Sequence, residues 1–381
     1  MKYLIVLFKG VLRGIYFILK LFPTNKKKVV FISRQQNRPS MDFLLLKDEI
    51  NKIDDGYKIV FLCKKMGSNT KMLFKYFFHI LRQMYHLATS SACVVDSYSI
   101  AVSVLNHKKS LKVIQIWHAI ATVKKFGHQT IGKKYGRSEK IANVLNMHNN
   151  YDWVISGSEV MVPIFAETFN IEKDRVKAIG TPRIDYLIKD NVTIRNNILT
   201  IYPELNSKKV ILYAPTFRRN EVVDFEKIIS TVDLDEYNLI IKTHPVKKQK
   251  ISNDKVYSCK EFTTMELLTV ADYVVTDYSA ISIEASLLGK AVFFYVYDYE
   301  SYVKNNGLNI DIFNEMKGCC YKSFKPLYKK IQNGVYDYAQ LEKFRDKYVS
   351  NQVGDSGYIL ANFIVNNTWL ENRKRKVDLN E

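Results

Sequence analysis

Cysteine is scarce in this chain, and the few cysteines form no recognisable framework. Five occur among 381 residues, at positions 63, 93, 259, 319 and 320. Their number is odd and no CxxC pair is present, which argues against a disulfide scaffold and against a structural zinc site. This usage is typical of a protein in a reducing compartment.

Several signatures of nucleotide-binding and hydrolytic enzymes are also absent. The sequence contains no GxGxxG fingerprint, no GxxxxGK[ST] loop, no HExxH helix and no GxSxG elbow. One DxD motif, Asp233 to Asp235, lies in a polar region between a helix and a loop, and we do not interpret it as a metal site. The sequence therefore requires neither a cofactor nor a metal.

Acidic residues are few relative to basic ones. The chain has 57 Lys and Arg against 38 Asp and Glu, a formal net charge of +19. Such a surplus attracts polyanions, which include nucleic acid, anionic lipid and phosphate-rich substrates. No RRM, helix-turn-helix or zinc signature is present, and the aromatic residues lie mainly in apolar stretches. We therefore expect no nucleic-acid partner.

The N-terminal 25 residues lack the uninterrupted apolar run of a membrane span, because Lys9 and Arg13 break it. On a helical wheel Lys2, Lys9, Arg13 and Lys20 fall within roughly 40° of one another, and the remaining surface is apolar. This pattern predicts an amphipathic helix on an anionic membrane surface. A helix buried against the protein, and a signal or spanning segment, remain alternatives.

A second amphipathic stretch covers residues 71–87. Its basic residues and histidines share one helical face, and Phe74, Phe77 and Phe78 lie away from it. The pattern favours a core-packing helix with a solvated basic face, and a second membrane contact is the alternative.

After Pro23 the pattern becomes α/β, with short apolar runs separated by stretches of helical length. Such runs are typical of parallel strands covered on both faces. The expected strands are residues 29–33, 58–62, 93–96, 113–117, 153–156, 210–214, 239–242, 273–276 and 291–295.

These strands predict two doubly wound domains that face a cleft, where the carboxyl ends of the strands would form the active site. We place the first Rossmann-like domain at residues 26–195. The second covers residues 196–360. Residues 361–381 would be the end of a helix and a basic tail.

Two histidines follow predicted strands, one in each domain. His118 lies in the segment IWHA and precedes Lys124 and Lys125, whereas His244 lies in KTHP. A histidine at a strand end can take a proton from an attacking hydroxyl near neutral pH. An ordinary structural histidine is the alternative at each position.

A third strand end carries the segment TDYSAISIE, with Thr276, Asp277, Ser279 and Glu284. Hydroxyl groups and backbone N–H groups at the start of a helix would hold a phosphate, and Glu284 could bind a ribose diol. A serine-capped helix without ligand is the alternative. In APTFRR, Arg218 or its neighbour could bind phosphate in a bidentate way.

The segment GTPRID, residues 180–185, combines a Gly/Pro turn with a possible Arg183–Asp185 pair. We interpret this segment as mainly structural.

Taken together, the segments WHA…KKFG, GTPRID, APTFR, KTHP and TDYSAISIE resemble the CDP-glycerol glycerophosphotransferases of teichoic acid and capsular polymer synthesis. They occur in the order of that family and cover roughly residues 90–305. The chain differs from the usual pattern at Ala119, at Ser279-Ala280 and at Glu284, which concerns the choice of polyol more than the reaction.

The resemblance implies a GT-B fold and a peripheral enzyme on the cytoplasmic face of the membrane. Its donor would be CDP-glycerol or CDP-ribitol, and its acceptor a lipid-linked saccharide or a polyol-phosphate chain. The nearest alternative is a GT-B glycosyltransferase, which would release a nucleoside diphosphate where this family releases CMP.

Within that reaction, His118 would be the general base for the acceptor hydroxyl. His244 and Arg218 would stabilise the transferred phosphoryl group and the departing CMP. Thr276, Asp277 and Ser279 would hold the pyrophosphate and Glu284 the cytidine ribose. Lys124 and Lys125 would guide the anionic acceptor.

Overall fold

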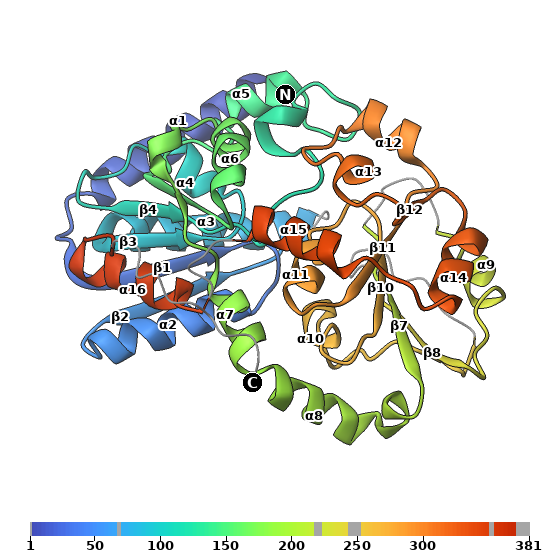
Figure 1. Cartoon of the computed structure of the whole chain (residues 1–381). Helices are drawn as coiled ribbons and strands as arrows, with labels where there is room; N and C mark the ends of the chain where they lie inside the picture. The colour runs from blue at the N-terminus through green and yellow to red at the C-terminus, as the bar shows by residue number, and fades with distance from the viewer. Residues whose placement is uncertain (1, 67–69, 217–222, 243–252, 350–353, 371–381) are drawn as a thin grey trace. The chain divides into compact units, whose positions relative to one another are not determined.

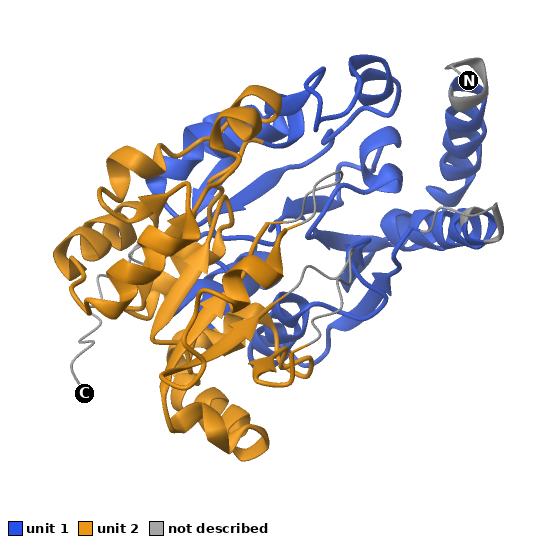
Figure 2. Cartoon of the chain, turned by 90° about the vertical axis from the view of Figure 1, so that its right-hand side faces the viewer, with its two compact units in different colours: residues 1–120, 126–185, 350–381 blue, residues 121–125, 186–349 orange. Residues whose placement is uncertain are grey.

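The structure is a computed structural model that describes residues 2–66, 70–216, 223–242, 253–349 and 354–370. The chain forms two compact units (Figure 2). The first contains residues 1–120, 126–185 and 350–381, and the second contains residues 121–125 and 186–349. Each unit is built around one six-stranded sheet (Figure 1).

The first sheet has the strand order β2-β1-β3-β4-β5-β6, and all its strands are parallel. Strands β1 and β3 lie side by side within the sheet, and buried Val, Ile and Phe of β1 and Ala, Cys and Val of β3 fill both faces. The strands are β1 (Asn25–Ser33), β2 (Lys58–Cys63), β3 (Ser90–Val95), β4 (Lys112–Gln115), β5 (Trp153–Ser156) and β6 (Val176–Ala178).

The second sheet has the order β12-β11-β10-β7-β8-β9 and is also entirely parallel. The strands are β7 (Lys209–Tyr213), β8 (Tyr237–Ile241), β9 (Val256–Tyr257), β10 (Tyr273–Thr276), β11 (Ala291–Tyr295) and β12 (Cys320–Tyr321). The prediction of two parallel α/β sheets is therefore confirmed, and every strand predicted from an apolar run is present.

Helices cover both faces of the first sheet (Figure 1). Helices α2 (Met41–Ile53) and α16 (Ser356–Asn366) pack side by side on one face, where Phe43, Leu360 and Phe363 share a cluster with Phe31 of β1. Helix α3 (Thr70–Thr89) packs on the other face against β1, β2 and β3, and α1 (Lys2–Leu19) packs on α3. The remaining helices of this unit are α4 (Ile100–Val104), α5 (Glu139–Val144) and α6 (Val162–Phe169).

Helix α16 returns the chain to the first unit, whereas the sequence pattern assigned its first residues to the second domain and the rest to a tail. Its apolar residues are required beside α2, because Leu360 and Phe363 are buried in the core of the first unit. Helix α7 (Pro182–Lys189) contains the boundary between the two units in sequence.

Helix α1 is oriented differently from the sequence-based expectation of a cationic stripe facing lipid. Lys9 Nζ donates to the carbonyl of Val144 at 3.3 Å and to Asn146 Oδ1 at 2.8 Å, and Arg13 Nε donates to the carbonyl of Val104 at 3.0 Å. These two cations therefore bond to the first unit, although Arg13 is largely exposed. No helix in the described part of the chain is long and apolar enough to cross a bilayer.

The second sheet is also flanked by helices. Helix α11 (Ile281–Leu287) contacts β10 and β11, and α15 (Tyr338–Tyr348) packs on α11. The other helices of this unit are α8 (Asn191–Ile201), α9 (Phe225–Ile229), α10 (Thr264–Leu267), α12 (Tyr299–Asn305), α13 (Ile312–Glu315) and α14 (Phe324–Gln332).

Candidate active site

The carboxyl ends of β3 and β4 bring Asp96 and His118 together in the first unit. The two strands are neighbours, with Val95 paired to Gln115. Strand β4 ends at Gln115 rather than at Trp117, so Trp117 and His118 belong to the turn that follows it. The predicted placement of His118 just beyond a strand end is therefore confirmed.

A hydrogen bond fixes the imidazole of His118. Its Nδ1 lies 3.0 Å from the backbone carbonyl oxygen of Asp96, and the Gln35 side-chain amide lies 3.4 Å from the same nitrogen. A carbonyl oxygen only accepts, so the shorter bond to Asp96 requires the proton on Nδ1, and the longer contact with the Gln35 amide nitrogen is then not a hydrogen bond. In the neutral ring this tautomer leaves the lone pair on Nε2, which is the arrangement that a general base needs.

The side chain of Asp96 is a buried carboxyl group that the sequence reasoning missed. Burial raises its pKa to about 6, and the hydroxyls of Ser33 and Ser97 oppose that rise. Its Oδ1 is buried without a hydrogen-bond partner. The available signal was its position directly after the apolar run of β3, beside the strand that leads to His118.

The GTPRID segment forms the turn between β6 and α7. Gly180 has φ +81°, and a Cβ at this position would lie 2.5 Å from Ser356 Oγ, so the turn requires glycine. Arg183 pairs with Asp42. Asp185 accepts from the backbone N–H groups of Gly354 at 2.8 Å and Gly357 at 2.7 Å.

In the second unit, Thr276 and Asp277 end strand β10 as predicted, but both side chains are buried and bonded to backbone. Thr276 Oγ1 donates to the carbonyl of Ala214 at 2.8 Å. The Asp277 carboxylate accepts from the N–H of Thr216 at 2.9 Å and from the N–H of Tyr278 at 2.6 Å. These bonds connect the loops that follow β7 and β10.

Ser279 and Glu284 lie beyond this loop. Helix α11 begins at Ile281, later than the start near Ser279 that the sequence suggested, and Ser279 Oγ accepts from the N–H of Ile281 at 3.3 Å. Ser279 is partly exposed, whereas Glu284 lies in the first turn of α11 and is buried.

Lys124 and Lys125 belong to the segment of residues 121–125 in the second unit. Lys124 forms an antiparallel bridge with Leu308, and the N–H of Lys125 donates to the carbonyl of Gly307 at 3.0 Å. Their backbone is therefore fixed to the segment that follows α12. The predicted residues His244 and Arg218 lie outside the described residues.

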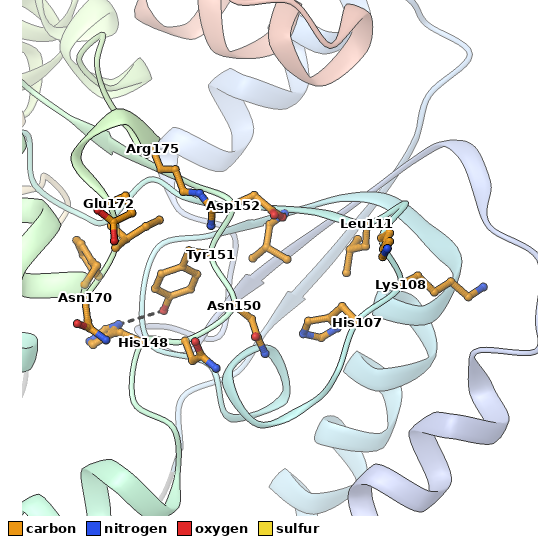
Figure 3. Close-up of a pocket in the computed structure, with 15 residues that line it drawn as sticks. His107, Lys108, Leu111, His148, Asn150, Tyr151, Asp152, Asn170, Glu172 and Arg175 are labelled. Atoms are coloured by element: carbon orange, nitrogen blue, oxygen red, sulfur yellow. Dashed lines mark hydrogen bonds between the residues drawn. The ribbon is translucent and has the colours of Figure 1, made fainter.

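A pocket of about 530 Å³ is present in the first unit (Figure 3). Residues that precede β4 and β5 line it, and none of the predicted site residues is among them. Its polar groups bond to one another and to nearby backbone, as in the 3.1 Å contact between His148 and Tyr151 and the 2.7 Å bond from Asn150 to the Leu105 carbonyl. We therefore do not assign the active site to this pocket.

Metal-binding side chains do not gather in the described residues. No group of three or more His, Cys, Asp or Glu side chains there is placed to hold a metal ion. Among the described residues, the candidate groups are His118 in the first unit and the polar turn after β10 in the second unit.

Residues 15–366 match the family described as CDP-Glycerol:Poly(glycerophosphate) glycerophosphotransferase. The chain is 30% identical to the teichoic acid ribitol-phosphate primase of Bacillus spizizenii over 372 residues, which are 93% of this chain and 95% of the relative. It is also 30% identical to the teichoic acid glycerol-phosphate primase of Bacillus subtilis, over 76% of this chain and 77% of the relative. It spans about half, 54%, of the teichoic acid poly(ribitol-phosphate) polymerase of Bacillus spizizenii at 30% identity.

Solved structures show a common fold. The wall teichoic acid polymerase TagF superposes with a TM-score of 0.73 at 21% identity, covering 96% of each chain. The UDP-GlcNAc 2-epimerase of Methanocaldococcus jannaschii superposes with a TM-score of 0.58 at 16% identity, covering 89% of this chain and 99% of that one. The fold is therefore GT-B-like.

Proposed function

Because the chain belongs to the CDP-glycerol:poly(glycerophosphate) glycerophosphotransferase family, we propose that it transfers glycerol phosphate from CDP-glycerol to a lipid-linked saccharide or a polyol-phosphate chain. The reaction releases CMP and contributes to teichoic acid or capsular polymer synthesis. Similarity to primases of both polyols makes CDP-ribitol the second candidate donor.

In this reaction the acceptor hydroxyl oxygen attacks the phosphorus that carries glycerol. The bond from this phosphorus to the bridging oxygen breaks, CMP leaves with that oxygen, and a phosphodiester forms. His118 Nε2 takes the acceptor proton. The observation that supports this role is the 3.0 Å contact of Nδ1 with the Asp96 carbonyl, which assigns the lone pair to Nε2.

The donor is assigned to the second unit. Ser279, which is partly exposed, bonds the pyrophosphate, and Glu284 bonds the cytidine ribose. Thr276 and Asp277 act by shaping the loops after β7 and β10, since their side chains are bonded to backbone there. His244 and Arg218 stabilise the phosphoryl charge, and Lys124 and Lys125 guide the acceptor.

We assign membrane attachment, on the cytoplasmic face, to the apolar surface of α1 and α3. Phe8 of α1 and Phe77 of α3 pack with ring centroids 6.0 Å apart. Beside them both helices expose large apolar side chains, since Phe17 is 67% exposed and Phe74 is 65% exposed. We call this the apolar face; its members are Val6, Leu7, Val11, Phe17, Ile18, Met72, Phe74 and Phe78.

Because Lys9 and Arg13 bond to carbonyl groups of the first unit, the apolar face contributes more to membrane binding than a cationic stripe would. We expect Phe17→Ser and Phe74→Ser each to weaken binding to neutral phosphatidylcholine vesicles about fivefold to tenfold. Leu44→Ser is the matched control, because Leu44 is an exposed apolar residue of α2. Unchanged vesicle sedimentation in both Phe variants would contradict this assignment.

The transfer reaction is tested by CMP release from the full-length protein. CDP-glycerol and CDP-ribitol are supplied separately, with a lipid-linked acceptor in anionic vesicles. Acceptor-dependent CMP from one donor is the expected result and identifies the polyol. Release of a nucleoside diphosphate from a nucleotide sugar, without CMP from either CDP-polyol, would indicate a glycosyltransferase.

A further inference from the structure

An ion pair lies directly beneath the turn that carries His118. The Arg183 guanidinium bonds to the Asp42 carboxylate through Nε, at 2.6 Å from Oδ2, and through Nη2. Its remaining nitrogen, Nη1, donates to the backbone carbonyl of His118 at 3.0 Å. The guanidinium thus connects a fixed carboxylate to the backbone of the candidate base.

The pair is unusual in its burial and in its position on the helix. The Asp42 side chain is 1% exposed and that of Arg183 is 19% exposed. Buried ion pairs lose much of their attraction to desolvation, so stability alone is a weak reason for one. Arg183 also lies in the first turn of α7, where the helix dipole disfavours a cation. Both features indicate that the role of Arg183 is its contact with the backbone carbonyl of His118.

The backbone that Arg183 holds is strained. Trp117 has φ +55°, a left-handed conformation that a bulky side chain rarely adopts. Gln115 Oε1 accepts from the N–H of Trp117 at 2.8 Å, on the side of the turn before His118. The Arg183 bond to the His118 carbonyl holds the other side, so the two contacts together maintain the conformation.

The rings on this turn depend on that conformation. The Trp117 ring centroid lies 4.0 Å from that of His118 and 4.4 Å from that of Phe126, with which it stacks. If the turn relaxed, the imidazole would move relative to the Asp96 carbonyl, and Nδ1 would lose the bond that defines the tautomer.

We propose that Arg183 and Asp42 are positioning residues, which hold the strained Trp117–His118 turn so that His118 Nε2 presents its lone pair to the acceptor hydroxyl. The proposal rests on the function proposed above and names residues that act through His118 rather than on substrate. Asp42 is the fixed point, because its Oδ1 also accepts from the N–H of Arg183 at 2.9 Å.

The test replaces the guanidinium but keeps its charge. Arg183→Lys retains a cation beside Asp42 and loses the fork that reaches the His118 carbonyl. We expect kcat for CMP release to fall about 10-fold to 100-fold, with the KM for the CDP-polyol changed less than about twofold. If this variant does not fold, Asp42→Asn tests the same contact while it keeps an oxygen acceptor.

Asp185→Asn is the matched control, since Asp185 lies in the same helix and accepts from the backbone N–H groups of Gly354 and Gly357. It should lower Tm and leave the turnover of the folded protein within about twofold of wild type. Wild-type turnover in Arg183→Lys would overturn the proposal.

A double variant separates positioning from direct catalysis. If Arg183 acts through His118, adding Arg183→Lys to His118→Ala causes no further loss of turnover. A second loss of the same size as in the single variant would show that Arg183 acts independently, and would also overturn the proposal.

A measurement that does not depend on enzyme activity tests this proposal separately from the transfer reaction. In protein labelled with ¹⁵N-histidine, the imidazole signals of His118, assigned by their loss in His118→Ala, should show the Nδ1-protonated tautomer. Arg183→Lys should give a mixture of tautomers, and an unchanged pattern would overturn the proposal. Absence of CMP release from wild-type protein with either donor would instead count against the proposed function.

Discussion

The turn after β4 presents a histidine, whereas the turn after β10 buries its polar side chains. Both turns follow a strand inside a parallel six-stranded sheet. In the first, Asp96 and Arg183 bond to the ring and backbone of the half-buried His118. In the second, Thr276 and Asp277 bond to the backbone of the neighbouring loop after β7.

Equivalent positions in similar sheets can therefore support a reaction in different ways. A reacting side chain needs a surrounding shell that fixes its rotamer and tautomer. A phosphate-binding loop needs backbone N–H groups in fixed positions, and buried polar side chains can hold them there. Variants in the first turn should therefore lower turnover. Variants in the second should lower stability, and they should weaken donor binding only where they displace backbone N–H groups.

The largest effect is expected at the histidine. His118→Ala should lower kcat about 10²-fold to 10⁴-fold, because it removes the general base, with little change in Tm. The measurement is CMP release at saturating donor. His128→Gln is the matched control, because His128 is another half-buried histidine bonded to a backbone carbonyl, that of Met147 at 2.7 Å. Wild-type-like turnover in folded His118→Ala protein would refute the assignment.

The next effect concerns the second turn. Asp277→Ala removes a buried carboxylate that accepts from two backbone N–H groups, of Thr216 and Tyr278. We expect the free energy of unfolding to fall by roughly 4 kcal/mol and the donor KM to rise. Urea unfolding and CMP-release kinetics measure the two. A large loss of kcat, with donor KM and stability unchanged, would show that the second turn affects turnover as the first turn does.

Much of this fold could be predicted from the sequence, because the central strands are continuous apolar runs. The strands that the sequence analysis missed are β6, β9 and β12, and each lies at an edge of its sheet. They are only two or three residues long, too short to stand out as an apolar run. The position of α16 could not be predicted either, because the sequence of an apolar helix does not indicate which sheet it packs against.

The site could be predicted only in part. His118 was identified by its position after an apolar run, which local sequence reveals. Asp42 and Arg183 are 141 residues apart, and no local pattern joins them. Arg183 has an aspartate two positions later, and local sequence suggested that nearer residue and gave no sign of Asp42. The burial of Thr276 and Asp277 likewise depends on the loop after β7, which is distant in sequence.

A smaller effect should appear in the pH dependence of the first turn. The pKa of Asp96 rises from 3.8 to about 6 because the carboxyl is buried. Between these pH values the folded protein binds a proton that the unfolded chain has lost, so stability falls as pH rises, by about 3 kcal/mol. Asp96→Asn lacks this titration. Its free energy of unfolding relative to wild type should therefore increase between pH 4 and pH 7, and parallel curves would contradict the prediction.

The smallest effect tests whether the second turn acts through its backbone. Thr276→Val removes the hydroxyl that donates to the Ala214 carbonyl and should cost about 1 kcal/mol of stability, measured by urea unfolding. Because Thr276 is fully buried and its proton is engaged, the donor KM should change by less than about threefold. Thr276→Ser, which keeps the hydroxyl, is the control. A tenfold rise in donor KM in Thr276→Val, absent in Thr276→Ser, would mean that this hydroxyl contacts the pyrophosphate, and the second turn would then bind its ligand through side chains as the first does.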